Sequence, residues 1–179
     1  MNGKGLQSLN IRPEHPGDQA AIHAVNASAF KTDSEARVVD LLRERCRPFI
    51  SLVAEVDEQV VGHILFTPVQ LYTAEAWIVE GMGLAPLAVL PEYKNRGIGS
   101  ALCESGLAEL IRRTAPFVVV LGHPGYYPRF GFVQAIECHI QCAYPDVPSE
   151  AFMIKVFDQA AVAGLSGVIH YRPEFDAVT

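Results

Sequence analysis

The chain has 179 residues, about one domain's worth, and 50% of them are hydrophobic, so it can bury a sizeable core without disulfide or metal staples. Its net charge of −6 disfavours a nucleic-acid-binding domain, so any site for an anion must be local. The mean hydropathy of +0.19 is high for a soluble domain, and either a homodimer interface or a long apolar groove would account for it.

The cysteines favour a reduced, metal-free protein. Cys46, Cys103, Cys138 and Cys142 contain no C-x-x-C pair. On one strand Cys138 and Cys142 would share a face and His139 would point to the other, so we interpret them as free thiols and expect no metal site. The first residues lack the apolar segment of a secretory signal, and no apolar run approaches a membrane span. We therefore expect a soluble, cytoplasmic protein.

The N-terminal part of the chain predicts one strand and two helices. Residues 9–12 form a short strand that Pro13 closes, and apolar residues at helical spacing predict a helix over 16–30. Ser34 is the expected N-cap of a second helix over 35–45, whose buried stripe contains Val38, Leu41 and Leu42. We interpret the basic residues near its end as helix C-terminal charges rather than a ligand site; they are Arg43, Arg45 and Arg47.

The middle of the chain predicts strands. Residues 50–56 and 59–71 form an antiparallel hairpin around the polar turn Asp57–Glu58, and His63 within it is interpreted as structural. A long strand over 77–90 follows, with Gly81 and Gly83 as points of interruption. Residues 117–121 are a continuous apolar run, typical of a strand buried on both faces.

The last third predicts short elements. Residues 122–132 are dense in Gly, Pro and aromatic residues and predict a turn, a helical turn and a second turn. Short strands are expected over 132–134, 137–142, 152–157 and 168–171, with a loop over 144–149. No internal repeat or linker is present, so we expect one domain over residues 1–179.

The stretch from Leu84 to Ala108 organises the rest of the chain. Its apolar run stops at Pro91, a polar turn follows from Lys94 to Ser100, and an amphipathic helix continues to about Arg113. The first N–H groups of a helix lack intrahelical acceptors, and the helix dipole adds about half a positive charge there. Gly97 and Gly99 allow the backbone to approach a ligand closely, so the turn predicts an anion site.

Two common phosphate-binding motifs do not match this turn. A Walker loop has its lysine after the glycines, whereas Lys94 precedes Gly97. A dinucleotide-binding fold needs a third glycine and an early βαβ unit, whereas the predicted elements before the turn form an antiparallel meander. The remaining pattern is a basic residue followed, after two positions, by G-x-G.

At this point the chain resembles the GNAT acetyltransferase superfamily, and within it the YhbS-like bacterial group. The resemblance rests on a strand and its exit, a turn, an aromatic element with the Gly-His-Pro before it, and the opening of the chain: LAVLPEY from Leu87, KNRGIGS from Lys94, YYPRFGF from Tyr126 with GHP from Gly122, and IRP from Ile11 with Asp18. It covers about residues 9–157 and leaves 158–179 as a C-terminal extension. It implies an α/β (α+β) fold with a mixed, mostly antiparallel central sheet of about six to seven strands and helices on both faces.

The resemblance also implies the donor and the residues that hold it. The donor would be acetyl-CoA, without a metal, with its pyrophosphate on the turn and its pantetheine along the strand before it. The strand residues would act through backbone groups, and an N–H near Leu87 or Ala88 would polarise the thioester carbonyl. The family more often has Gln or Arg at the position of Lys94; Lys keeps the charge of an Arg but lacks its planar fork, so its contact should be weaker. The implied CoA-binding residues are Leu87, Ala88, Val89, Lys94, Asn95, Arg96, Gly97, Ile98, Gly99 and Ser100.

Catalytic roles follow from the same resemblance. Tyr127, four residues before Gly131, is the expected general acid for the CoA thiolate, with Tyr126 as the alternative if the turn is shifted. Glu80 is the first candidate for the base and Glu75 the second. His123 could take the proton, bind the acceptor or be held by turn backbone, and ordered water could replace any base.

The leading hypothesis is therefore an acetyl-CoA-dependent N-acetyltransferase that acts on a primary amine of a small molecule or protein. The alternative is a non-catalytic acyl-CoA-binding or regulatory domain of the same fold. O- or S-acylation and a longer acyl donor stay open. On the acceptor side the candidates are Phe30 with Lys31, and residues 144–152.

Overall fold

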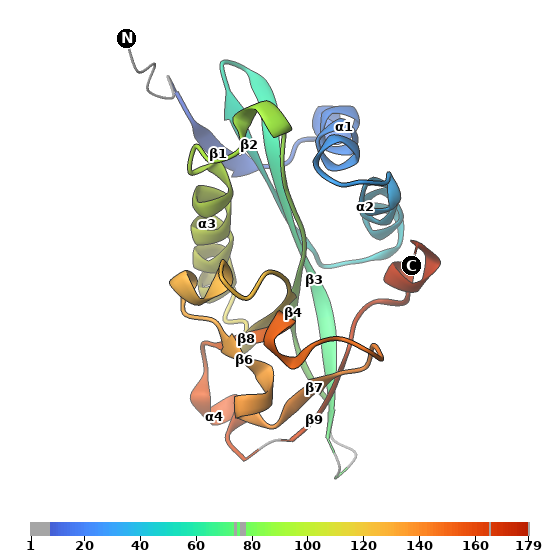
Figure 1. Ribbon diagram of the computed structural model, residues 1–179, viewed down its shortest axis with the longest axis vertical. Helices are drawn as coiled ribbons and strands as arrows, with labels where there is room; N and C mark the ends of the chain where they lie inside the picture. The colour runs from blue at the N-terminus through green and yellow to red at the C-terminus, as the bar shows by residue number, and fades with distance from the viewer. Residues whose placement is uncertain (1–7, 74, 76–77, 165, 179) are drawn as a thin grey trace. The chain divides into compact units, whose positions relative to one another are not determined.

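The computed structural model describes residues 8–73, 75, 78–164 and 166–178, and the first element among them is a strand, which two α-helices and then three strands follow (Figure 1). The strands are β1 (Asn10–Pro13), β2 (Ile50–Val56), β3 (Gln59–Thr73), β4 (Ile78–Val89), β5 (Phe117–Leu121), β6 (Val133–Gln134), β7 (Ile140–Cys142), β8 (Phe152–Val156) and β9 (Gly167–His170). The α-helices are α1 (Gln19–Ala29), α2 (Ser34–Arg45), α3 (Ile98–Arg112) and α4 (Gln159–Val162).

The chain divides into two compact units, each of which we describe by itself. Unit 1 takes in Met1–Phe66, Pro86–Leu107 and Glu174–Thr179. Unit 2 takes in Thr67–Ala85 and Ala108–Pro173. The strands β3 and β4 and the helix α3 contribute residues to both.

Unit 1 is built on an antiparallel meander. β1 pairs with β2, and β2 pairs with β3 around the turn Asp57–Glu58, where both residues have positive φ, 49° and 64°. The end of β4 joins through Leu90 N–H, which donates to the Val61 carbonyl at 2.9 Å. The predicted hairpin is therefore confirmed.

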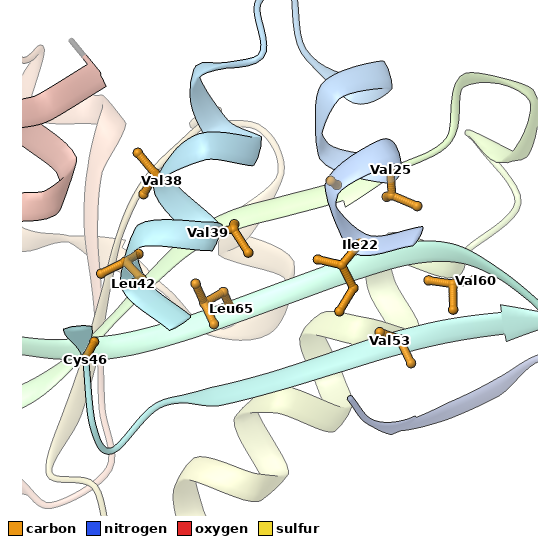
Figure 2. Packing of buried hydrophobic residues seen from close by; sticks show 10 residues of the cluster. Ile22, Val25, Val38, Val39, Leu42, Cys46, Val53, Val60 and Leu65 are labelled. Atoms are coloured by element: carbon orange, nitrogen blue, oxygen red, sulfur yellow. The ribbon is translucent and has the colours of Figure 1, made fainter. Parts of the chain in front are cut away.

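Helices cover both faces of this meander. α1 and α2 lie side by side on one face, where their apolar residues pack on Val53 and Leu65 (Figures 1 and 2). Side chains alternate along a strand, so Gly62 of β3 faces the opposite side of the sheet from Leu65. On that side it lies against Ile98 and Leu102 of α3. The cluster on the α1–α2 face contains Ile22, Val25, Val38, Val39, Leu42, Cys46, Val53, Val60, Leu65 and Ala88.

An arginine fixes the start of the chain in unit 1. The Arg12 guanidinium donates to Asp18 at 2.7 and 3.1 Å and to Glu55 at 2.7 and 3.0 Å. The hydrogen bonds from Arg12 lower the pKa of Asp18, although burial opposes them. This three-residue group joins β1 to β2 and to the turn before α1, which gives the Arg12 and Asp18 of the opening motif a structural role.

Unit 2 contains the only parallel pairs described. β4 pairs with β5 in parallel, from Met82 with Val118 to Leu84 with Val120. β5 pairs with β8, β8 with β6, and β9 with β3, all antiparallel, while β7 lies parallel to β9. The buried cluster here contains Val69, Leu71, Phe117, Val119, Ala135, Ile140, Phe152, Ile154 and Ile169.

The expected fold class is confirmed: the sheet is mixed and largely antiparallel, with helices on both faces in unit 1. Seven strands lie on its continuous path, while β7 and β9 lie off it. The C-terminal residues treated as an extension supply β9, which pairs with β3. Gly81 and Gly83 do not interrupt β4; a Cβ at Gly81 would collide with the Phe117 ring, so glycine is required by close packing. The predicted strand start at Trp77 lies outside the described residues.

Three local predictions were wrong. Asp33, not Ser34, caps α2, because Arg37 N–H donates to the Asp33 carbonyl and its guanidinium to the Asp33 carboxylate. Val39 is buried in the stripe of that helix, whereas Leu41 is only partly buried. Residues 137–142 are not one strand.

The break in residues 137–142 has a backbone cause. A 3₁₀ helix covers Ala135–Cys138, and His139 then adopts a left-handed φ of 57° before β7 begins. Cys138 and Cys142 are therefore not on one strand, and the sequence argument from their shared face fails.

Candidate functional site

The turn before α3 has the backbone of an anion site. Asn95 and Gly97 have left-handed φ values of 62° and 82°, and the space where a Gly97 Cβ would lie is open. The first intrahelical bond of α3 runs from Ala101 N–H to the Gly97 carbonyl at 3.0 Å. The N–H groups of Ile98, Gly99 and Ser100 precede that bond, so they are the donors that a helix N-terminus offers to an anion.

Two basic side chains flank this turn. Lys94 Nζ donates to the Ala29 carbonyl at the end of α1, at 3.4 Å, where the helix dipole favours a cation. The Arg96 guanidinium lies over the Tyr93 ring, 5.2 Å from its centroid. Both side chains are exposed, so they add positive charge to the turn of an acidic protein.

The strand before the turn can offer its backbone. Ala88 is buried in the core of unit 1, whereas Leu87 and Val89 alternate with it and are only partly buried. Three register pairs join β4 to β5 and end at Leu84, although β4 continues to Val89. The arrangement suits the addition of an extended ligand along the last residues of the strand.

Tyr127 begins a short 3₁₀ helix in unit 2, η3 (Tyr127–Phe130). Only 8% of the surface of Tyr127 is exposed. Its ring packs directly on Gly122, where any Cβ would collide with it, and edge-on against Phe132 at 5.6 Å between centroids. Lys155 Nζ donates to the Phe130 carbonyl at 2.7 Å, and Gly131 ends the helix with a φ of 84°. These contacts fix Tyr127 against the end of β5.

The neighbours of Tyr127 have other contacts. The Arg129 guanidinium covers the Tyr126 ring at 4.7 Å, and Phe130 packs edge-on against the same ring. His123 is exposed, and its Nδ1 accepts a hydrogen bond from Gly125 N–H at 3.2 Å, as expected of a histidine held by turn backbone. The geometry therefore favours Tyr127 over Tyr126 as the constrained phenol.

Glu80 lies far from Tyr127 along the strands of unit 2. Gly83 pairs with Val119, so Glu80 is three residues before that level and Leu121 is two residues after it. Five residues at roughly 3.3 Å each place the exposed Glu80 about 17 Å from the end of β5. Glu75 precedes β4 in an exposed turn and is further still along the chain.

His63 is at the centre of a buried polar network in unit 1. Its Nδ1 lies 3.0 Å from Asn26 Nδ2, and its Nε2 lies 3.0 Å from Ser51 Oγ. Ser51 Oγ in turn donates to Glu14 at 2.5 Å, and Arg43 binds both Glu14 oxygens at 3.0 and 3.1 Å. The Asn26 amide also donates to the Ile22 carbonyl, so a neutral His63 protonated on Nε2 gives each hydrogen bond of the ring one donor and one acceptor.

Charge and burial hold this network in one protonation state. Burial lowers the pKa of His63 to about 3, against the attraction of Glu14. Burial alone would raise the pKa of Glu14, but hydrogen bonds from Arg43 and Ser51 outweigh it and lower that pKa. The interpretation of His63 as structural is consistent with this arrangement. Arg47 donates to the carbonyls of Arg43 and Cys46, which gives the predicted helix C-terminal role to that arginine.

Sequence reasoning missed Tyr171. The residue follows β9, its hydroxyl oxygen is enclosed, and its ring stacks on Tyr144 at 5.8 Å between centroids. The ring also lies against Gly83 of β4, where a Cβ would come within 2.8 Å of it. Burial, and to a lesser extent Cys142, Tyr144 and Tyr127, raise the pKa of Tyr171 well above its ordinary value. A tyrosine at the end of a predicted strand was the one available signal.

The other predicted groups have simple environments. Cys46 and Cys103 are buried and Cys138 and Cys142 partly buried, all as free thiols. Within the described ranges, no three His, Cys, Asp or Glu side chains come together as a metal site. Phe30 packs against the core of unit 1, whereas Lys31 is exposed. Of the helices in the described part of the chain, none is long and apolar enough to cross a membrane.

Comparison with known proteins places this geometry in a family. Residues 10–135 match the family model described as an acetyltransferase (GNAT) domain. The chain is 35% identical over 167 residues to the uncharacterized N-acetyltransferase YhbS of Escherichia coli K12, covering 93% of this chain and 98% of that protein.

Solved structures agree with the sequence match. The crystal structure of the Escherichia coli GNAT family N-acetyltransferase YhbS in complex with CoA matches with a TM-score of 0.87 and 33% identity, over 98% of this chain and 96% of that one. A Brucella melitensis GNAT family acetyltransferase in complex with acetyl-CoA matches with a TM-score of 0.75 and 34% identity, over 94% and 99%. The chain therefore belongs to the GNAT acetyltransferase family, as its strand, turn and aromatic motifs predicted, and is an acyltransferase of that family.

Proposed function

We propose that this chain transfers the acetyl group of acetyl-CoA to a primary amine by direct attack within a ternary complex. The observation that carries the proposal is the turn before α3, with its left-handed Gly97 and three N–H groups ahead of the first helical bond. The relatives in complex with CoA and acetyl-CoA support the same donor.

The turn and the end of β4 would bind the donor. The N–H groups of residues 96–100 would hold the pyrophosphate, and Lys94 and Arg96 would add charge. The backbone of Leu87 and Val89 would pair with the pantetheine amides, and an N–H near Leu87 or Ala88 would donate to the thioester oxygen. Because these interactions use backbone groups, CoA binding would not require particular side chains at these positions.

The chemistry then requires two proton transfers. The neutral amine nitrogen forms a bond to the thioester carbon while the carbonyl π electrons move onto oxygen. Collapse of this tetrahedral species breaks the C–S bond, and Tyr127 would give its phenol proton to the sulfur as it leaves. The proton lost by the amine would go to water or to His123, and the distance of Glu80 from the end of β5 ranks it below them. Solvent would reprotonate Tyr127.

Thermal unfolding with acetyl-CoA, followed by thiol release with an amine panel, tests the proposal. A ligand present at 100 times its Kd stabilises the native state by about 2.7 kcal/mol, so acetyl-CoA should raise Tm. Thiol should then appear only when an amine is added. A rise in Tm without thiol release from any amine would leave the non-catalytic acyl-CoA-binding domain, and an unchanged Tm at millimolar acetyl-CoA would refute both.

Cytoplasmic location and a homodimer belong to the same proposal. Size-exclusion chromatography with light scattering tests the dimer, and cell fractionation tests the location.

A further inference from the structure

A pocket of about 240 Å³ lies in unit 2 between β7, the segment before β8 and the start of β8. Its apolar wall consists of Ile136, Ile140, Val147 and Phe152. Its remaining described lining is Gln141, Cys142, Tyr144 and Ser149. The volume is below that of typical drug-sized sites, so it suits a small ligand.

Backbone pairing brings this pocket to the end of β5, where Tyr127 lies. Phe152 pairs with Leu121, and Gly122 N–H donates to the Ala151 carbonyl at 2.9 Å. The Tyr127 ring rests on the same Gly122. Phe152 of the pocket wall therefore pairs with Leu121, the residue just before Gly122, on which the ring of the proposed general acid rests.

Aromatic packing makes a second, independent connection. Tyr144 lines the pocket, and its ring stacks on Tyr171. Tyr171 in turn packs on Gly83 of β4, and Gly83 pairs with Val119 of β5. The pocket, Tyr144, Tyr171 and Gly83 thus form a continuous series of contacts within unit 2.

The lining is uncharged. None of the described residues that line the pocket is Asp, Glu, Lys or Arg. Burial raises the pKa of the Cys142 thiol, although a backbone hydrogen bond from Tyr144 opposes it, so this cysteine stays a neutral, apolar wall at pH 7. A ligand with a second charged group would lose hydration here without gaining an ionic partner.

We propose that this pocket binds the body of the acceptor, and that the acceptors are small alkyl or arylalkyl amines that carry no charge besides the reacting amine. The inference rests on the proposed function and adds its substrate class. A pocket without a charged side chain also disfavours the ammonium form, which lowers the pKa of the bound amine and increases the neutral fraction that attacks. That effect reduces the need for a side-chain base.

A second pocket in unit 2 provides the control. It has a volume of about 350 Å³ and is lined by Gly131, Val133, Ile154, Val156 and Val162 among others. It lies at the far end of η3, beside Gly131 rather than Tyr127. Val133 lines this second pocket and Ile136 lines the first, and both residues are 44% exposed. Val133→Trp and Ile136→Trp are therefore a matched pair of variants.

The experiment measures kcat/KM for phenethylamine, putrescine and γ-aminobutyrate with saturating acetyl-CoA. Phenethylamine should be preferred over the two charged-body amines by about tenfold or more. Ile136→Trp should lower kcat/KM for phenethylamine by about tenfold, whereas Val133→Trp should leave it within about twofold. Ser149→Asp should shift the putrescine-to-phenethylamine ratio by about threefold toward the diamine, because it adds an exposed carboxylate to the pocket. The acetyl-CoA-induced rise in Tm shows that each variant is folded.

The outcomes separate this inference from the proposed function. Turnover of putrescine or γ-aminobutyrate at the rate of phenethylamine, or equal losses in Ile136→Trp and Val133→Trp, would overturn the pocket while leaving the acetyltransferase intact. If no amine is acetylated, calorimetric titration of phenethylamine into the CoA-bound protein tests whether the pocket binds the amine. Binding that Ile136→Trp abolishes would support the pocket and refute catalysis, and absence of binding would overturn the pocket.

Discussion

The two units of this chain offer ligands different kinds of groups. In unit 1 the anion turn is backbone: N–H groups at the start of α3 and a left-handed Gly97, in one continuous segment. In unit 2 the candidate groups are side chains from separate segments: Tyr127 after β5, Tyr144 after β7 and Tyr171 after β9. The residues of a backbone site lie together in one short sequence motif, whereas a site made of side chains depends on how distant segments pack.

This difference explains why the donor is easier to infer than the acceptor. Pyrophosphate has the same shape in every acyl-CoA, and a helix N-terminus suits it whatever the nearby side chains. An acceptor must be recognised by volume and polarity, which in the pocket proposed for it depend on Ile136, Val147 and Phe152 together. Variants in the two units should therefore separate donor binding from turnover.

The largest effect is expected in unit 2. Tyr127→Phe keeps the ring that packs on Gly122 and Phe132 but removes the proton that the thiolate needs, so kcat should fall by about 10² or more while the Kd for acetyl-CoA changes little. Steady-state kinetics and calorimetry measure the two quantities. Tyr126→Phe is the matched control, because Arg129 already covers that ring, and it should retain most activity. Unchanged turnover in Tyr127→Phe would remove the general-acid assignment.

The next effect belongs to unit 1. Gly97→Ala places a side chain at a φ of 82°, which costs on the order of 1–2 kcal/mol, and it also puts a Cβ into the open space at the turn, where an anion would lie. We expect the Kd for acetyl-CoA to rise about tenfold or more. Gly164→Ala is the control, since Gly164 has a φ of 72° and equally open surroundings. Both variants should lose similar stability, and an equal loss of acetyl-CoA affinity in both would show that the turn is not the anion site.

Sequence patterns were sufficient where structure is local. The β2–β3 hairpin, the helices α1 and α3 and the anion turn each follow from residues adjacent in the chain, and their bounds agree to within a few residues. Sequence patterns failed where the backbone of one residue decides, as at His139, whose left-handed φ of 57° separates a 3₁₀ helix from β7 within the predicted strand. No hydrophobic period reports such a value for a non-glycine residue.

Long-range pairing was the second limit. Tyr171 is placed by β9, whose residues Gly167–His170 pair with Thr73–Gln70 of β3. The sequence marks residues 168–171 as a strand but cannot say which strand they join, so the contacts of Tyr171 with Gly83 and Tyr144 were not accessible. The pocket beside Tyr144 was out of reach for the same reason.

The third prediction perturbs the stability of unit 1. His63 has a pKa of about 3 in the folded protein against about 6.5 when unfolded, so between these values the unfolded chain binds more protons. The contribution of neutral His63 to the free energy of unfolding is therefore fully present above about pH 6.5. It is lost as pH falls, by about 1.4 kcal/mol for each pH unit well inside this window. The groups facing the ring are Asn26, Ser51 and, beyond them, Glu14 and Arg43.

Urea denaturation from pH 6.5 to 5.5, followed by circular dichroism, measures this slope. His63→Gln removes the titrating group, so its free energy of unfolding should be lower at pH 7 but much flatter with pH. Glu14, whose pKa is lowered in the folded state, adds its own loss only below about its ordinary pKa, outside the window used. Parallel slopes for the wild type and His63→Gln would exclude His63 as the source.

The smallest effect tests whether side chains contribute to the backbone site of unit 1. Lys94 donates to the Ala29 carbonyl at 3.4 Å, an exposed contact of little energetic value, so its ammonium can turn to an anion at low cost. Lys94→Met should raise the Kd for acetyl-CoA by about threefold at low salt and less at high salt, since exposed charges are screened. Lys31→Met, which removes an exposed lysine at the end of α1, is the control and should leave the Kd unchanged. A loss in Lys94→Met as large as that in Gly97→Ala would mean that the side chain, rather than the backbone, dominates the turn.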